Sequence, residues 1–218
     1  IVAFRRPYVS HVLFDLDGTL TDSKEGIIKS VAYGLEKMGE TTTGRLDQHV
    51  VVGPPLMTTF TEVYGFSEEK ARTLYSLFQE RYATVGLFEN RPFPGILPML
   101  KTLREKGVKS YVATSKPVIH ARSICDKFGI TPYMEYIAGS QLGGKETKAL
   151  IIEDVLRRIG PVPRENILMV GDRKYDVVGA REKGLAVAVV TFGYGSEEER
   201  AACPADFVAT DVETLLDI

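Results

Sequence analysis

Short apolar runs that alternate with helix-length segments constrain the fold of this chain more than any other feature. The runs are HVLF, VKSYVAT, YIAG, NILMVG and LAVAVVT, at residues 11–14, 108–114, 136–139, 166–171 and 185–191. Strands that alternate with helices are typical of a mostly parallel, doubly wound sheet. The runs are apolar throughout rather than at every second position, as expected when helices cover both faces. The sequence therefore predicts an α/β fold with a doubly wound parallel sheet.

One long stretch, residues 22–90, interrupts this alternation. It carries helical patterns, such as GIIKSVAYGLEKMG at 26–39 and SEEKARTLYSLFQERYATVGLF at 67–88, and no convincing core strand. The prolines and the glycine of RPFPG, at 91–95, break helical continuity where the stretch ends. We therefore expect a helical insertion between the first strand and the rest of the sheet.

The predicted domain organisation follows from this insertion. Residues 1–20 and 92–218 form the α/β core domain, and residues 21–91 form a helical cap domain. A lid of this kind excludes water and completes a site on closing, so we expect it to select the substrate. Its loop HVVVGPPLM, at 49–57, is either a rigid finger that reaches the site or a plain turn between helices.

Composition and charge argue against several classes of protein. A net charge of −2, without a dense basic stripe and interleaved aromatic residues, argues against a nucleic-acid partner. No apolar run is long enough for a signal sequence or a membrane span, so we expect a soluble, cytoplasmic protein without a membrane partner. The two cysteines, Cys125 and Cys203, form no CxxC pattern, which favours reduced thiols over a disulfide or a zinc site.

Two aspartates follow the first predicted strand, in FDLDGTL. Ligands of open α/β sheets bind outside the carboxyl ends of the strands, which is where Asp15 and Asp17 lie. Side chains two positions apart in a strand share a face, so both carboxylates point toward one place while Leu16 turns toward the core. Gly18 then permits a tight turn. Two carboxylates so close raise at least one pKa, so we expect a positive group beside them.

A second acidic pair follows the fourth apolar run. Asp172 comes just after the run, and Asp176 lies about one helical turn further, which returns it to the same side. Together with Asp15 and Asp17 they form a cluster of hard oxygen ligands that suits Mg²⁺, waters and a substrate phosphate. One such aspartate alone could be a helix cap or a turn residue. Four at the ends of two strands favour the metal site.

Hydroxyl groups and lysines follow the other strands. In VATSK, residues 112–116, Thr114 and Ser115 offer hydroxyl and N–H groups to phosphoryl oxygens, although a helix cap would use the same residue types. Lys145 and Lys148 precede a helix with an aliphatic face. A lysine there neutralises a carboxylate and a phosphate together, or it is simply solvated, which is the interpretation that we favour for Lys145.

Four motifs in order, DLDGTL, VATSK, Lys148 and GDRKYD, resemble those of the haloacid dehalogenase-like hydrolase superfamily. The resemblance covers nearly the whole chain, because the helical stretch after TDS is similar to the cap that this superfamily inserts after its first motif. Locally, VVGPPL at 51–56, TKALI at 147–151 and GYGSEEE at 193–199 are similar to the branch with phosphoglycolate phosphatases and nucleotidase-like phosphatases.

The resemblance implies a role for each motif residue. It implies that Asp15 is the nucleophile, Asp17 the general acid and base, and Lys148 the lysine that neutralises charge. The implied substrate-binding residues are Thr114, Ser115 and Lys116. The implied ligands of a Mg²⁺ cofactor are Asp15, Asp17, Asp172 and Asp176.

These roles describe a Mg²⁺-dependent phosphomonoester hydrolase that acts on a small phosphorylated metabolite. Asp15 attacks phosphorus and forms an acyl phosphate. Asp17 protonates the departing alkoxide and later takes a proton from the water that hydrolyses the intermediate. Mg²⁺ and Lys148 offset the repulsion between the two anions. A dehalogenase has no leaving oxygen to protonate, so Asp17 argues against that activity.

Three alternatives stay open from the sequence. A sugar phosphomutase of the same superfamily usually carries a histidine on the first cap helix, where this chain has Ile27. A receiver-like signalling module also uses clustered aspartates and a lysine around Mg²⁺, but it lacks a place for the long insertion. A scaffold that binds a partner through the cap would leave the complete motif set unexplained. The physiological substrate, the oligomeric state and any regulatory partner are not encoded in a pattern that we can interpret.

A few other polar residues are candidates for contact with the substrate. Lys24, Arg45 and Lys116 could bind a second anionic group. Of the three histidines, only His49, beside the 49–57 loop, is placed to meet a substrate.

Overall fold

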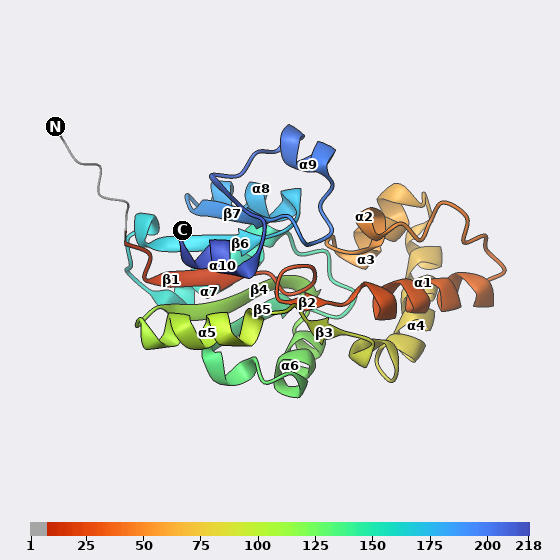
Figure 1. Ribbon diagram of the computed structural model, residues 1–218. Helices are drawn as coiled ribbons and strands as arrows, with labels where there is room; N and C mark the ends of the chain where they lie inside the picture. Colours follow the sequence, from red (N-terminus) through yellow and green to blue (C-terminus); the bar gives the residue numbers. More distant parts are fainter. Residues whose placement is uncertain (1–7) are drawn as a thin grey trace.

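The computed structural model describes residues 8–218 and centres on a six-stranded parallel sheet (Figure 1). The strand order is β5-β4-β1-β6-β7-β8, and each neighbouring pair is parallel. The strands are β1 (His11–Phe14), β4 (Lys109–Pro117), β5 (Met134–Ser140), β6 (Ile167–Gly171), β7 (Ala186–Val190) and β8 (Phe207–Ala209). The first strand lies inside the sheet with later strands on both sides, so the predicted doubly wound α/β fold is confirmed.

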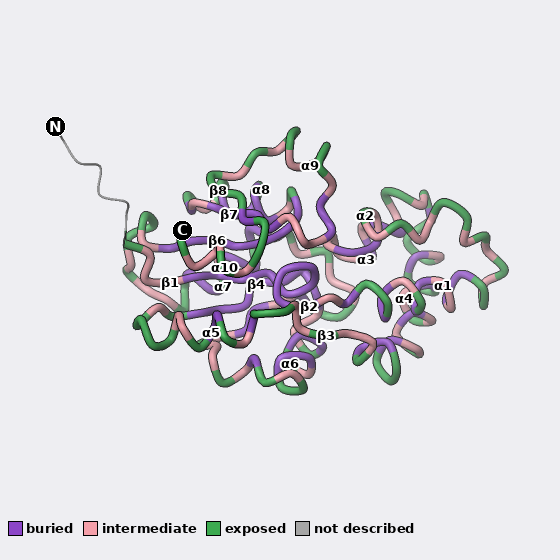
Figure 2. Tube along the Cα trace, in the orientation of Figure 1, coloured by how far each residue is buried: buried purple, intermediate pink, exposed green. Residues whose placement is uncertain are grey.

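Helices cover both faces of the sheet and make its strands the most buried part of the trace (Figure 2). Successive residues of β1 point to opposite faces. The helices are α5 (Ile96–Glu105), α6 (Val118–Lys127), α7 (Lys148–Ile159), α8 (Lys174–Glu182), α9 (Glu197–Ala202) and α10 (Val212–Leu216). Val12 and Phe14 join the core that contains residues of α5 and α6, whereas Leu13 joins the core that contains residues of α7 and α8. Two short helices, η3 (Thr131–Tyr133) and η4 (Arg164–Asn166), lie in connections.

A group of helices leaves the sheet after β1 and returns before α5. We call residues 24–88 the helical insertion. It starts and ends beside a two-stranded antiparallel pair, β2 (Thr21–Asp22) with β3 (Arg91–Pro92). In Figure 1 it lies beyond the end of the sheet at which β1 finishes. Its helices are α1 (Lys24–Lys37), α2 (Gln48–Val51), α3 (Leu56–Thr58), the π-helix η1 (Thr59–Val63), α4 (Glu68–Tyr82) and η2 (Gly86–Phe88).

Glycines allow the helices of the insertion to approach closely. A Cβ on Gly26 of α1 would lie 1.9 Å from the carbonyl oxygen of Gly86, and a Cβ on Gly34 would lie 2.7 Å from a methyl group of Leu74 on α4. Neither distance is compatible with a larger residue in this arrangement. Gly34 therefore allows α4 to pack closely against α1, and Gly26 does the same for η2. α4 forms one wall of the site described below.

Four strands differ from the sequence expectation. β8, β2 and β3 have only two or three residues each, which is too short for a recognisable apolar run. β4 continues to Pro117, past the predicted end of its run at residue 114.

Residues 1–7 of the predicted core segment 1–20 lie outside the described residues. No helix in the described part of the chain has the length and apolar character to cross a membrane.

Candidate active site

Asp15 and Asp17 lie where β1 ends and the chain turns sharply. The N–H of Asp15 donates to the carbonyl oxygen of Val170 in β6 at 2.9 Å, so the backbone still follows the sheet at this point. Gly18 has a φ of 81°, and a Cβ there would lie 2.2 Å from Oδ2 of Asp172. Only glycine fits such a position without strain. The turn therefore brings the first aspartates close to the acidic residue that follows β6.

Lys148, the first residue of α7, places its ammonium group between two carboxylates. Its Nζ lies 3.1 Å from Oδ1 of Asp15 and 2.9 Å from Oδ1 of Asp176. All three side chains are at most 5% exposed, which strengthens the attraction between their charges. Lys145, the other lysine considered from the sequence, instead pairs with Glu68 at the surface. The geometry favours Lys148 as the lysine of the site.

Three buried carboxylates form a group that fits a divalent cation. Asp15, Asp172 and Asp176 each offer an oxygen within 4.8 Å of the others. Burial and the neighbouring Asp176 raise the pKa of Asp15 to about 7. Burial and the neighbouring Asp15 raise the pKa of Asp172 well above its ordinary value. One lysine leaves three buried carboxylates with excess negative charge, and hard oxygen ligands of this kind suit Mg²⁺. Among the described residues, Asp17 is not part of this group.

The carboxylate of Asp17 faces a second lysine instead. Nζ of Lys116 lies 3.3 Å from Oδ2 of Asp17, and both side chains are almost fully buried. Lys116 also donates to the hydroxyl of Tyr82 on α4. The other oxygen, Oδ1 of Asp17, is buried without a hydrogen-bond partner within residues 8–218. It is therefore free to accept or transfer a proton. Lys116, predicted to bind substrate, is already occupied by these two partners.

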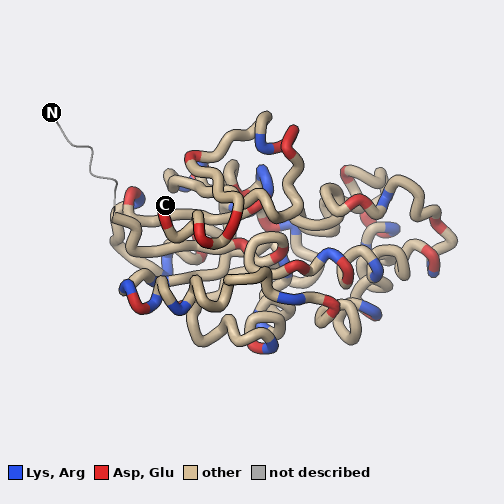
Figure 3. Tube along the Cα trace, in the orientation of Figure 1, with Lys and Arg blue, Asp and Glu red and all other residues tan. Residues whose placement is uncertain are grey.

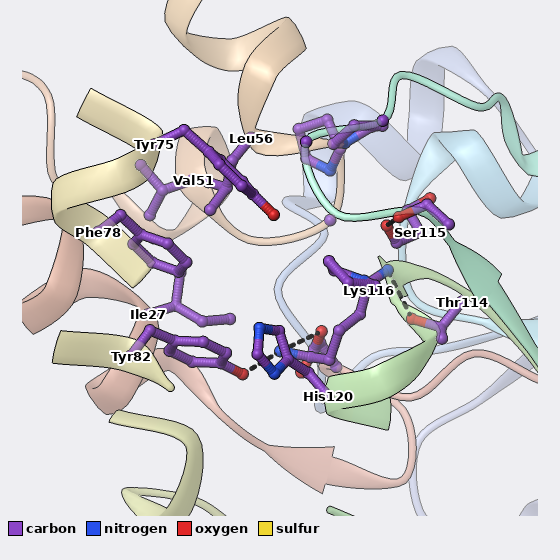
Figure 4. Close-up of a pocket in the computed structure, with 18 of the residues that line it drawn as sticks. Ile27, Val51, Leu56, Tyr75, Phe78, Tyr82, Thr114, Ser115, Lys116 and His120 are labelled. Atoms are coloured by element: carbon purple, nitrogen blue, oxygen red, sulfur yellow. Dashed lines mark hydrogen bonds and ion pairs between the residues drawn. The ribbon is translucent and has the colours of Figure 1, made fainter. Parts of the chain in front are cut away.

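Thr114, Ser115 and Lys116 lie in an irregular part of β4. In the pairing with β5, Ala113 faces Ala138 and Pro117 faces Ser140, so more residues lie on β4 than on its partner strand. An irregularity of this kind re-aims side chains at the end of a strand. Thr114, Ser115 and Lys116 all line the cavity beside Asp15 and Asp17. Figure 4 shows their side chains on the wall opposite α4.

A cavity of about 50 Å³ separates the aspartates from the helical insertion (Figure 4). The insertion contributes Ile27 of α1, part of the 49–57 loop and one face of α4. The residues of that α4 face are Tyr75, Phe78, Gln79 and Tyr82. Neither Lys24 nor Arg45 lines the cavity as the described residues define it, and Arg45 pairs with Glu40. Both the sheet edge and the insertion are therefore needed to enclose this space.

The 49–57 loop is fastened to the sheet by Arg173. The buried guanidinium group donates to the carbonyl oxygen of His49 at 2.7 Å and to that of Val52, and it pairs with Glu199 at 2.9 Å. Residues 53–56 of the loop line the cavity. This is the arrangement of a finger that reaches the site, one of the two alternatives from the sequence. The ring of His49 contacts the carbonyl oxygen of Tyr194 rather than the cavity.

Several residues that line the cavity were not identified from the sequence. Tyr75 and Gln79 lie on α4, and His120 lies on α6. Residues 75, 78, 79 and 82 have helical spacing, which is the pattern of an ordinary core face. Nothing in the sequence distinguishes that face from one that lines a cavity, because the distinction depends on how α4 packs above the sheet.

Comparison with known proteins agrees with this arrangement. The family model described as haloacid dehalogenase-like hydrolase matches residues 12–190. The chain belongs to this family. The matched span starts in β1 and ends with β7, so it includes every motif residue and the helical insertion of this haloacid dehalogenase-like hydrolase. The predicted membership of the superfamily, and with it the prediction of a hydrolase, is confirmed.

Individual relatives of this haloacid dehalogenase-like protein carry several names. A 5'-nucleotidase of Pseudomonas aeruginosa is 42% identical over 91% of this chain and 90% of its own. The tyrosine-protein kinase PtkA of Mycobacterium tuberculosis is 41% identical over 84% of this chain and 62% of its own. A crystal structure of a predicted phosphatase from Clostridium acetobutylicum superposes with a TM-score of 0.90, at 37% identity, over 97% of this chain and 100% of its own. Phosphoglycolate phosphatases, 26–27% identical, also match, so the predicted branch is confirmed.

Proposed function

We propose that this protein is a Mg²⁺-dependent phosphomonoester hydrolase that acts on a small phosphorylated metabolite through an aspartyl-phosphate on Asp15. One observation carries the proposal. Asp15 and Asp17 are two residues apart, yet each faces its own buried lysine, at 3.1 Å from Lys148 and 3.3 Å from Lys116. Two carboxylates in different environments suit the two different tasks of nucleophile and proton carrier.

The proposed reaction has two steps. In the first, a carboxylate oxygen of Asp15 attacks phosphorus, the P–O bond to the alcohol breaks, and Asp17 gives its proton to the departing alkoxide. In the second, Asp17 takes a proton from water as the water oxygen attacks phosphorus, and the bond from phosphorus to Asp15 breaks. Inorganic phosphate and free Asp15 result. The free Oδ1 of Asp17 supports this role, because it has no competing partner among the described residues.

The residues around Asp15 would bind the phosphoryl group and the cation. Thr114 and Ser115 offer hydroxyl groups beside Asp15 in the cavity. Asp15, Asp172 and Asp176 would hold Mg²⁺. When bound, Mg²⁺ supplies positive charge that offsets the repulsion between the nucleophile and the phosphoryl oxygens. Lys148 adds a fixed positive charge that favours the ionised form of Asp15 and holds its carboxylate in place.

The proposal includes a moving lid. We divide the chain into a core, residues 1–20 and 92–218, and a cap, residues 21–91, because the β2–β3 pair lies at the two crossings. A cavity of about 50 Å³ is smaller than the roughly 300–1,000 Å³ of most small-molecule sites. A substrate larger than a phosphoryl group therefore requires the cap to move outward before it binds.

The cytoplasmic location expected from the sequence stays a prediction.

The competing functions are less well supported. Ile27, where a phosphomutase would be expected to carry a histidine, is a buried apolar side chain on the cavity wall and has no group for proton transfer. A receiver-like module has no place for a long insertion after its first strand, and here the helical insertion lines the site. The kinase relative extends well beyond the part that this chain matches. Because this relative is named a tyrosine-protein kinase, we include phosphotyrosine among the substrates to be tested.

The experiment measures phosphate release with and without Mg²⁺. The panel contains phosphoglycolate, nucleoside monophosphates, sugar phosphates and phosphotyrosine. The wild type is compared with Asp15→Asn and with a matched control, Asp211→Asn, at an exposed helix cap. We expect Mg²⁺-dependent turnover in the wild type and the control and none in Asp15→Asn. Turnover that ignores Mg²⁺, or that survives in Asp15→Asn, would contradict the proposal.

A further inference from the structure

Two polar groups on the cavity wall have no hydrogen-bond partner within residues 8–218. They are the hydroxyl of Tyr75 and the amide nitrogen Nε2 of Gln79, and both atoms are shielded from solvent. The other end of the Gln79 amide is held, because its Oε1 lies 2.8 Å from Nε2 of His120. Buried polar groups in native proteins are nearly always paired. Unpaired groups on a cavity wall indicate that a ligand pairs with them.

These groups lie at a defined distance from the proposed reaction centre. Tyr82, at the end of α4, bonds to Lys116, which in turn pairs with Asp17. Gln79 is three residues and Tyr75 seven residues back along the same helix face. At 1.5 Å per residue, Tyr75 lies about 10 Å along α4 from Tyr82. Figure 4 shows Tyr82, Phe78 and Tyr75 one above the other on this wall.

The wall between the two ends is apolar. Phe78 and Tyr82 are stacked rings with centroids 4.9 Å apart. Beside them, the insertion also contributes Ile27, Val51 and Leu56 to the cavity lining (Figure 4). A leaving group that follows α4 therefore meets Gln79 about one turn beyond Tyr82, and it passes Phe78 before it reaches Tyr75. Such a surface binds an apolar or flat body through burial and ring contacts.

No free positive charge lines this route. Among the described residues that line the cavity, the single lysine or arginine is Lys116. Lys116 already forms an ion pair with Asp17 and a hydrogen bond with Tyr82. Burial, with Lys116 nearby, lowers the pKa of His120 to about 4, so its ring is neutral near pH 7. Lys148 is held between Asp15 and Asp176. A carboxylate or a second phosphate on the leaving group would therefore be buried without a partner, which is unfavourable.

We propose that this site selects phosphomonoesters whose leaving alcohol is uncharged, and that Gln79, partway along α4, and Tyr75, at the far end, bind its hydrogen-bonding groups. The alcohol has an apolar or flat body that spans about 10 Å, as the nucleoside of a nucleoside monophosphate does. His120 is a positioning residue that orients the Gln79 amide. The inference rests on the proposed phosphatase function and narrows its substrate class. It disfavours short anionic substrates such as phosphoglycolate.

The test compares kcat/KM for three probes. Adenosine 5'-monophosphate has a long, uncharged leaving group, and 2-phosphoglycolate has a short, anionic one. Acetyl phosphate is too short to reach the outer turns of α4. The variants are Tyr75→Phe and Gln79→Leu. The matched control is Tyr33→Phe, because the Tyr33 hydroxyl bonds to Glu80 away from the cavity.

We expect the wild type to prefer adenosine monophosphate over phosphoglycolate by at least about tenfold, since a buried unpaired charge disfavours the latter. Each cavity variant should lower kcat/KM for adenosine monophosphate roughly 5- to 150-fold, the range for loss of one buried hydrogen bond. Acetyl phosphate and the Tyr33→Phe control should be unaffected. Equal or better use of phosphoglycolate, or an equal loss with acetyl phosphate, would overturn the inference. Failure of the wild type on all three probes would instead contradict the proposed function.

Discussion

Nζ of Lys116 lies 3.3 Å from Oδ2 of Asp17, inside the protein, with both side chains at most 12% exposed. Lys148 holds Asp15 in the same way. Two aspartates that share one turn are thus separated electrostatically by two different lysines. The separation leaves one oxygen of Asp17 free of hydrogen bonds in the described structure, and this is the atom that we expect to carry the proton.

Replacement of Asp17 by asparagine should nearly abolish turnover. Asparagine keeps the shape of the side chain but cannot give or take the proton, so we expect kcat to fall by about 10²- to 10⁴-fold. The measurement is steady-state phosphate release, with far-ultraviolet circular dichroism as the check that the variant is folded. A folded Asp17→Asn protein with kcat within tenfold of the wild type would exclude Asp17 as the acid and base.

Removal of Lys148 should destabilise the protein when no divalent cation is present. Lys148→Met leaves the carboxylates of Asp15 and Asp176 buried without their partner, a change that typically lowers the free energy of unfolding by about 3–5 kcal/mol. Lys145→Met breaks only an exposed pair with Glu68, which is worth about 1 kcal/mol or less. Urea unfolding in a chelator compares the two. Equal losses would show that the Lys148 pairs contribute no more than a surface pair.

Removal of Arg173 should release the 49–57 loop. Arg173→Leu deletes the donors to the carbonyl oxygens of His49 and Val52 and the pair with Glu199. Hydrogen bonds to charged groups contribute about 1.5–3 kcal/mol each, so the open loop should become at least about tenfold more populated. Subtilisin cleavage, mapped by mass spectrometry, should then rise at residues 49–57. Arg72→Leu, at an exposed pair on α4, is the control and should cleave like the wild type.

His120 should make the protein less stable as the pH falls from 6.5 to 4. Burial and nearby Lys116 lower the pKa of His120 to about 4 in the folded protein, against an ordinary value of about 6.5. Between these two pH values His120 is protonated in the unfolded chain but not in the folded protein. The free energy of unfolding therefore decreases as the pH is lowered, by an amount on the order of 2 kcal/mol. His120→Gln cannot titrate and should lose less. Identical pH dependence of the unfolding free energy in both proteins would rule this out.

Most of the sheet could be predicted from the sequence because five of its strands are apolar runs of four or more residues that helices separate. The run at 166–171 became β6, Ile167–Gly171, with one residue of difference. β8 and the β2–β3 pair could not be predicted, because a strand of two or three residues carries no periodicity. Their pairing depends on neighbours that only the fold brings together.

The charged residues of the site could be predicted from the sequence, whereas the residues of α4 that line the cavity could not. Asp15 and Asp172 stand out as carboxylates at strand ends, and the structure brings them within 4.8 Å together with Asp176. Tyr75 and Gln79 have the spacing of a core-facing helix. Their exposure to the cavity depends on how closely α4 packs against Gly34 of α1. That is a packing relationship, which no local pattern records.

The position of the covalent phosphoryl group during turnover tests the role of Asp15 most directly. The wild type is mixed with acetyl phosphate and Mg²⁺, quenched in acid, digested, and analysed by mass spectrometry. We expect one phosphoryl group on the peptide that contains Asp15, and none in the Asp15→Asn variant. A phosphoryl group on another residue, or wild-type turnover by Asp15→Asn, would contradict it.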